Sequence, residues 1–126
     1  MLPTVLFLHG FFASGACIPA QALRESLHGV ADVLSPDLPL HPAEALRFIR
    51  QICLDRHPAV LVGNSAGSFL AQQVAAEFSL PAVLGNPYFL MTEFLEPRRG
   101  PQRYKAPRAN GRQEFVIDQV LIDEFA

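Results

Sequence analysis

The sequence has no tryptophan and only two cysteines among its 126 residues. Cys17 and Cys53 match no metal-binding or redox spacing, so we expect buried thiols, no metal and no cofactor. No apolar run is long enough to cross a bilayer, which argues against contact with a membrane. The N-terminus also lacks the basic segment that begins a signal peptide. A cytoplasmic protein is therefore the expectation.

Charged residues are also few: they make up 17% of the chain, and the net charge of −2 favours no particular partner. Six of the ten basic residues nevertheless fall between Pro97 and Arg112, a segment without acids: Arg98, Arg99, Arg103, Lys105, Arg108 and Arg112. A solvated loop is one interpretation of this segment, and an anion-facing lid is the other. Its only aromatic residue is Tyr104, so we do not expect nucleic-acid binding.

Apolar residues, in contrast, make up 50% of the chain, which is enough for the core of a single domain over residues 1–126. Nearly continuous apolar runs predict strands that are covered on both faces, as in a parallel sheet. These predicted strands lie at residues 4–8, 30–34, 59–62 and 82–84.

Helical patterns lie between these strands. The first two helices begin near a proline, which suits a first helical turn, and the third spans residues 68–78. The expected apolar stripes are Ile18, Ala22, Leu23 and Leu27 in the first helix, and Ala45, Leu46, Ile49, Ile52 and Cys53 in the second. Strands that alternate with helices form βαβ units with right-handed crossovers. We therefore expect an α/β fold, a three-layer sandwich around a mostly parallel sheet of about four strands.

The regular pattern ends after Pro87. Residues 88–95 suit a short helix, and residues 97–112 show no apolar period, which predicts a loop. The apolar residues beyond them suggest a short strand followed by a helix, or a helical piece alone. These residues are Phe115, Ile117, Val120, Leu121 and Phe125.

The strand at 59–62 runs into Gly63-Asn64-Ser65-Ala66-Gly67, and a helical segment follows. A strand, G-x-S-x-G and a helix together form a nucleophile elbow, a sharp turn that exposes the serine Oγ at the end of the strand. Gly63 and Gly67 lack Cβ atoms, so the strand and the helix can approach closely. Ser65 is therefore the candidate nucleophile. The alternative is a tight turn whose serine merely caps the helix.

A serine nucleophile needs an oxyanion hole. One N–H group would come from Ala66, directly after the serine. The other would come from Phe11, in the loop after the first strand, where flexible Gly10 precedes it. We expect His9 to support this loop rather than to take part in the chemistry.

The base is harder to assign, because all four histidines precede Ser65. His28 and His57 follow the predicted helices, where a histidine favourably meets the helix dipole. His41 lies with Asp37 in the loop after the second strand, on the side where sites form in open α/β sheets. A rearranged base built from His41 and Asp37 is therefore a candidate. None of the acids after Ser65 directly follows a clear strand; they are Glu93, Glu96, Glu114, Asp118, Asp123 and Glu124.

Three segments resemble the α/β-hydrolase superfamily, and most closely the small bacterial YqiA-type esterases. They are Leu6-Phe7-Leu8-His9-Gly10-Phe11, Val62-Gly63-Asn64-Ser65-Ala66-Gly67 and Ala82-Val83-Leu84-Gly85-Asn86-Pro87. Those esterases share a Leu-His-Gly-Phe opening, an elbow followed by a helix, and an Asn-Pro after the next strand, in this order. The resemblance implies that Ser65 is the nucleophile and that the N–H groups of Phe11 and Ala66 are the oxyanion donors.

The resemblance covers about the first two-thirds of such an esterase. The family continues into a strand that bears an Asp and a last strand and loop that bear the His, so a chain that stops at Ala126 resembles a member without its C-terminal third. The implied strand order is 30–34, 4–8, 59–62, 82–84, with the last strand as an unpaired edge. Because such an edge invites pairing, we expect the apolar tail Phe115–Phe125 or a second copy of the chain, a homodimer, to cover it.

The leading hypothesis from the sequence is a serine hydrolase of carboxylesterase type that acts on a small-molecule ester. The competing hypothesis is a non-catalytic module of the same fold that binds a ligand or a partner. Its motivation is that no histidine follows Ser65.

Overall fold

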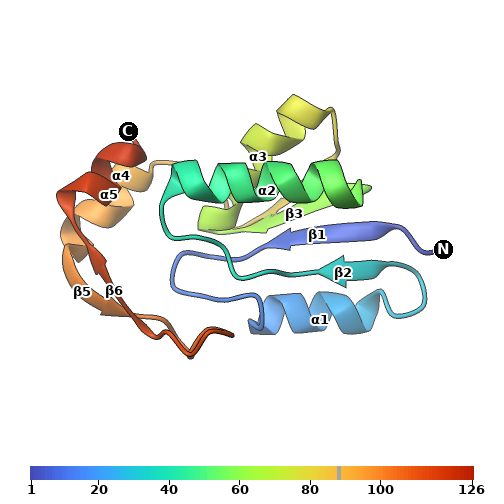
Figure 1. The fold of residues 1–126 in the computed structure, drawn as a ribbon, viewed down its shortest axis with the longest axis horizontal. Helices are drawn as coiled ribbons and strands as arrows, with labels where there is room; N and C mark the ends of the chain where they lie inside the picture. Colours follow the sequence, from blue (N-terminus) through green and yellow to red (C-terminus); the bar gives the residue numbers. More distant parts are fainter. Residues whose placement is uncertain (88) are drawn as a thin grey trace.

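A parallel sheet forms the centre of the structure, a computed structural model that describes residues 1–87 and 89–126. Its strands are β1 (Thr4–Leu8), β2 (Asp32–Leu34), β3 (Val60–Asn64) and β4 (Ala82–Gly85). They lie in the order β2-β1-β3-β4 (Figure 1), as the resemblance implied. All neighbours are parallel; Val5 of β1, for example, pairs with Val33 of β2 and with Val60 of β3. The predicted sheet is confirmed.

Helices cover both faces of this sheet. Helix α1 (Ile18–Ser26) lies on one face, and α2 (Pro42–Arg56) and α3 (Ala66–Phe78) lie on the other (Figure 1). The chain order explains this arrangement, because the β1–β2 connection runs across the sheet in one direction and the next two connections run in the opposite direction. Right-handed crossovers in opposite directions place their helices on opposite faces. The predicted three-layer sandwich is therefore confirmed.

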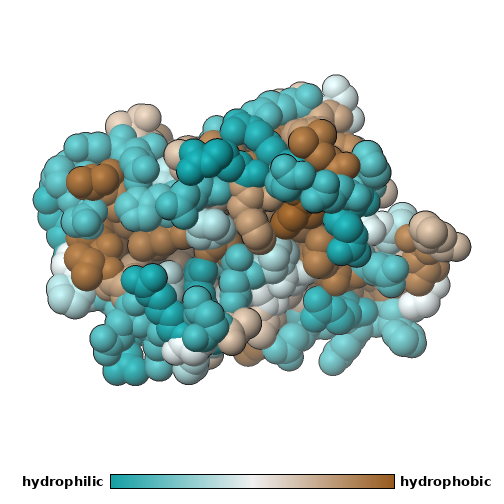
Figure 2. Space-filling view, in the orientation of Figure 1, coloured by the Kyte–Doolittle hydropathy of each residue, from teal (hydrophilic) through white to brown (hydrophobic). Residues whose placement is uncertain are grey.

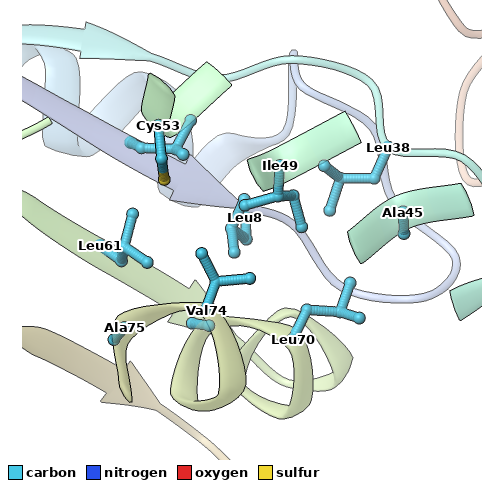
Figure 3. Close-up of a cluster of buried hydrophobic side chains, with 11 residues drawn as sticks. Leu8, Leu38, Ala45, Ile49, Cys53, Leu61, Leu70, Val74 and Ala75 are labelled. Carbon is cyan, nitrogen blue, oxygen red and sulfur yellow. The ribbon is translucent and has the colours of Figure 1, made fainter. Parts of the chain in front are cut away.

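The main core lies between the sheet and the helices α2 and α3. Side chains of both helices point toward Leu8 and Leu61 of the sheet (Figure 3). Leu6, Leu8, Ile49, Leu61 and Val74 are completely buried, and burying a large aliphatic side chain contributes about 1.5–3 kcal/mol. The predicted stripe of α2 faces this core, with Ala45, Ile49 and Cys53 buried and its other two members half-buried.

The apolar stripe predicted for α1 is largely wrong. Ala20 is the buried residue of this helix, whereas Ile18 is 80% exposed and Ala22 is exposed; Leu23 and Leu27 are half-buried. The neighbouring edge strand β2 has only three residues, so it offers little sheet surface for a helix to cover. An edge position of this kind does not require a wide apolar face.

The C-terminal part folds into two short helices and a hairpin. Its elements are α4 (Met91–Leu95), a 3₁₀ helix at Glu96–Arg98, β5 (Gly100–Arg103), β6 (Glu114–Ile117) and α5 (Gln119–Glu124). The expected strand-to-helix piece at the end of the chain is confirmed as β6 and α5. The short helix expected at 88–95 is α4, while the first residue of that range, Tyr88, lies outside the described residues.

The loop predicted for residues 97–112 is wrong in part, because β5 lies within it and pairs antiparallel with β6. The sequence of β5, Gly-Pro-Gln-Arg, has little intrinsic strand preference. Its partner β6 alternates buried and exposed residues, with Phe115 and Ile117 facing inward. Pairing with this half-buried partner is the tertiary contact that makes β5 a strand.

The C-terminal residues pack against the carboxyl end of the sheet rather than along its edge. Phe115, Ile117 and Leu121 share a second buried cluster with Phe11 and Ala66. The expectation that the tail covers the edge strand β4 is therefore wrong, and Val83 of β4 is 58% exposed. Covering by a second copy of the chain stays a prediction.

Apolar side chains also reach the surface near the hairpin. Figure 2 shows brown residues at the end of the molecule where α5 and β6 lie in Figure 1, and Val116 and Val120 are 52% and 64% exposed. Within the described ranges, no helix has both the length and the apolar character that a membrane span needs.

Candidate active site

Ser65 occupies a strained turn between β3 and α3. Its backbone has φ 56° and ψ −120°, and for a residue with a side chain a sparsely populated conformation costs about 1–3 kcal/mol. Hydrogen bonds on both sides hold the turn: the Ser65 N–H donates to Gly85 O at 2.9 Å, and the Ser68 N–H donates to Ser65 O at 2.9 Å. The Ser65 side chain makes no capping bond to α3. The alternative that this serine merely caps the helix is therefore wrong.

Two glycines allow α3 to start directly against the end of β1. A Cβ atom on Gly67 would lie 2.0 Å from Leu8 O, and a Cβ on Gly63 would lie 2.6 Å from Gly67 O. Both neighbours are backbone atoms, which cannot rotate away as a flexible side chain could. The elbow glycines are thus required by the packing of the turn, as the sequence predicted.

Ser68 joins the elbow to the neighbouring strand, a role that sequence reasoning missed. Its side chain is completely buried, and its Oγ lies 3.0 Å from Gly63 O and 3.3 Å from Gly85 O. A hydroxyl that links these two carbonyls ties β3, α3 and β4 together close to Ser65. The available signal was a serine among the small and apolar residues of the first turns of the helix.

The loop after β1 lies beside Ser65. A Cβ atom on Gly10 would be 3.5 Å from Ser65 Cβ and 4.0 Å from its Oγ. Two candidate oxyanion donors flank this position. Neither the Phe11 N–H nor the Ala66 N–H donates a backbone hydrogen bond to any residue that the structure describes. Ala66 begins α3, where N–H groups have no acceptor within the helix.

His9 fixes the shape of this loop. Its side chain is buried, Nδ1 donates to Gly10 O at 2.7 Å, and Nε2 accepts from the Leu38 N–H at 2.9 Å. Burial lowers the pKa of His9 from its usual 6.5 to about 4, although the bond to Gly10 opposes this shift. A neutral imidazole with both nitrogens engaged is a structural link between the loops after β1 and β2, which agrees with the expected supporting role.

A comparison with known protein families agrees with this geometry. The model of the Alpha/beta hydrolase family matches residues 5–125, nearly the whole chain. The chain belongs to the alpha/beta hydrolase family. The order of strand, serine elbow and helix in this family is the order that β3, Ser65 and α3 follow here.

The candidate base residues of this alpha/beta hydrolase have other partners. Nδ1 of His41 pairs with the carboxylate of Glu124 in α5. The Asp37 carboxylate accepts hydrogen bonds from the Gly15 N–H at 2.7 Å and from the Ala109 N–H at 2.9 Å. The structure thus gives each of the two residues partners other than Ser65. Their participation as a base for Ser65 stays a prediction.

Asp37 instead connects three segments at the carboxyl end of the sheet. Burial raises the pKa of its carboxyl, but the hydrogen bonds from Gly15 and Ala109 and the nearby Arg108 charge together hold the pKa below its usual range. An ionised Asp37 therefore links the loops after β1 and β2 to the basic hairpin. In the part of the chain that the structure describes, no group of three or more His, Cys, Asp or Glu side chains could hold a metal ion.

A narrow crevice of about 30 Å³ adjoins the elbow of the alpha/beta hydrolase. Gly10, Phe11 and Ala66 line one part of it, and Arg108 of the hairpin also lines it. The remaining walls are mainly apolar: Leu38, Pro39, Leu40, Pro42, Ala45, Leu70 and Phe125, together with His9. Such a volume has room for about one or two water-sized groups beside the candidate oxyanion donors.

Replacing Gly67 tests the close approach in the elbow. The Gly67→Ala substitution places a methyl group against Leu8 O, so we expect it to lower the free energy of unfolding by about 3 kcal/mol or more. Urea unfolding followed by circular dichroism measures this loss. Gly85→Ala is the matched control, because its Cβ meets its nearest atom at an ordinary 3.6 Å. Equal stability of the two variants would contradict the packing described here.

The low pKa of His9 predicts a stability change with pH. Below pH 6.5 the unfolded chain takes up a proton at His9, whereas the folded protein takes it up only near pH 4. Lowering the pH from about 6.5 to 4 should therefore remove about 3 kcal/mol of stability.

Unfolding in urea at several pH values checks this pH dependence. In His9→Gln the amide can keep both hydrogen bonds but does not titrate, so this part of the pH dependence should disappear. His28→Gln removes an exposed histidine and should behave as wild type. The same pH profile in wild type and His9→Gln would show that His9 is not a buried neutral imidazole.

Proposed function

We propose that this protein is a serine hydrolase of carboxylesterase type, similar to the YqiA-type esterases, with Ser65 as its nucleophile. The observation that carries the proposal is the position of Gly10 beside the Ser65 side chain: a Cβ atom added to Gly10 would lie 3.5 Å from Ser65 Cβ. It brings the strained serine and the loop with the second candidate N–H donor together at one end of the sheet. This arrangement supports acyl transfer, which needs a nucleophile and two donors around one carbonyl group.

The proposed reaction begins when Ser65 Oγ attacks the ester carbonyl and loses its proton to a base. The carbonyl oxygen becomes an oxyanion, which the N–H groups of Phe11 and Ala66 stabilise; removal of one such donor typically costs 10²–10³-fold in rate. Collapse of the tetrahedral intermediate breaks the bond to the alcohol, which leaves with a proton. Water then hydrolyses the acyl-enzyme by the same steps and releases the acid.

Two sources of the base are compatible with this proposal. His41 would act after turning from the Glu124 pair, or a histidine of a second chain would supply the imidazole. His41 lies between Leu40 and Pro42, which line the crevice, and its side chain is paired with Glu124. A His41→Ala variant separates the two: loss of turnover assigns the base to this chain.

The test of the proposal is the hydrolysis of 4-nitrophenyl acetate. Ser65→Ala should reduce turnover to the uncatalysed background. Gly10→Ala should keep the fold, because its Cβ would make ordinary contacts, but should lower kcat/KM about tenfold by filling the space where the acyl carbonyl approaches Oγ.

Gly29→Ala is the control, since it adds the same methyl group where no heavy atom lies within 4 Å. Its positive φ of 79° costs some stability but should leave turnover unchanged. The same low rate in wild type and Ser65→Ala would favour the other hypothesis, a non-catalytic module of this fold.

A further inference from the structure

The basic hairpin folds back over the carboxyl end of the sheet. The Lys105 N–H donates to Phe12 O at 3.0 Å, and the Ala109 N–H donates to Asp37. These bonds fix the segment between β5 and β6 above the loops after β1 and β2. Most of its cations remain exposed on the surface, whereas Arg108 is half-buried and reaches the crevice beside the elbow.

The Arg108 side chain is held rigidly at that place. Its guanidinium lies over the Tyr104 ring, 4.1 Å from the ring centroid. Nη1 donates to Leu38 O, and Nη2 makes a long bond of 3.4 Å to Ala13 O. Tyr104 is itself buried and stacks on Phe115, so its ring is a fixed support. A planar cation fixed in this way loses little conformational entropy when it binds a ligand.

One edge of this guanidinium has unused hydrogen-bonding capacity. Nε of Arg108 is buried and is an N–H donor without a hydrogen-bond partner among the residues that the structure describes. The Nε–H and one Nη2–H form a parallel pair of donors that matches the two oxygens of a carboxylate. A buried donor without a partner destabilises the protein, and an anion in contact with it would offset this cost.

We propose that Arg108 is a specificity-determining residue that binds a carboxylate of the substrate. This inference rests on the proposed function and names its substrate class: esters whose acyl group carries a carboxylate. The ester carbonyl lies between the N–H groups of Phe11 and Ala66, and the carboxylate pairs with Arg108, which lines the same crevice. The Asp37 carboxylate reduces the positive charge near Arg108, but it already accepts hydrogen bonds from the Gly15 and Ala109 N–H groups.

Two esters of equal length test the inference. The 4-nitrophenyl monoester of adipic acid carries the carboxylate, and 4-nitrophenyl hexanoate is its neutral counterpart. Wild type should prefer the anionic ester at least about tenfold in kcat/KM. In Arg108→Gln this preference should vanish through a higher KM for the adipate ester, with the hexanoate reaction changed less than about twofold. Arg108→Lys keeps the charge but not the fork, and should retain an intermediate preference.

Arg112→Gln is the matched control, because it removes an exposed cation from the same hairpin and should leave the preference intact. Circular dichroism spectra identify any variant that fails to fold, in which case Arg108→Lys decides the question. The inference would be overturned if wild type hydrolysed both esters with equal kcat/KM, or if Arg108→Lys kept the full wild-type preference. Either result would leave the hydrolase proposal standing.

A binding measurement separates this inference from the proposed catalysis. Calorimetric titration of the Ser65→Ala variant with adipic acid monoamide and with hexanamide requires no turnover. Binding of the monoamide alone, lost when Arg108→Gln is added, supports the carboxylate site even if no ester is hydrolysed. Equal affinity for the two amides, or no binding of either, would contradict it.

Discussion

The contact between Gly67 and the end of β1 is the constraint on which the rest of the site depends. The backbone of α3 approaches Leu8 so closely that no side chain fits at Gly67. Because of this approach, the turn before the helix must be tight, and Ser65 takes a positive φ of 56° that its neighbours hold in place. The same contact brings Ser65 beside Gly10, since Gly10 follows the strand against which the helix begins. Stability and the candidate chemistry thus have one origin in the packing of backbone atoms.

The sheet order determines where this contact occurs. After β1 the chain crosses toward β2, and after β3 it crosses toward β4, so the two connections leave in opposite directions. Parallel sheets form their binding crevices at such a reversal, outside the carboxyl ends of the strands. His9 and Asp37 then secure the surrounding loops, the first through Leu38 and the second through Gly15 and Ala109.

The local sequence was sufficient to predict the elements whose structure depends only on residues close together in the chain. Short sequence patterns predicted the apolar strands, the stripe of α2 and the elbow glycines around Ser65. The structure confirms these features. The α1 stripe and the strand β5 were not predictable in this way. The exposure of Ile18 depends on how little sheet lies beneath the helix, and β5 is a strand because β6 pairs with it. The pairing of His41 with Glu124 joins residues far apart in the chain, which no local pattern indicates.

Reaction of the protein with a fluorophosphonate probe tests the central claim most directly. An activated serine displaces the fluoride and becomes covalently phosphonylated, so intact-mass and peptide mass spectrometry report both the amount and the position of the label. The account predicts about one probe per chain, attached to Ser65, and none in Ser65→Ala. An unlabelled folded protein, or a label on a different residue, would contradict the claim that the elbow serine is a nucleophile.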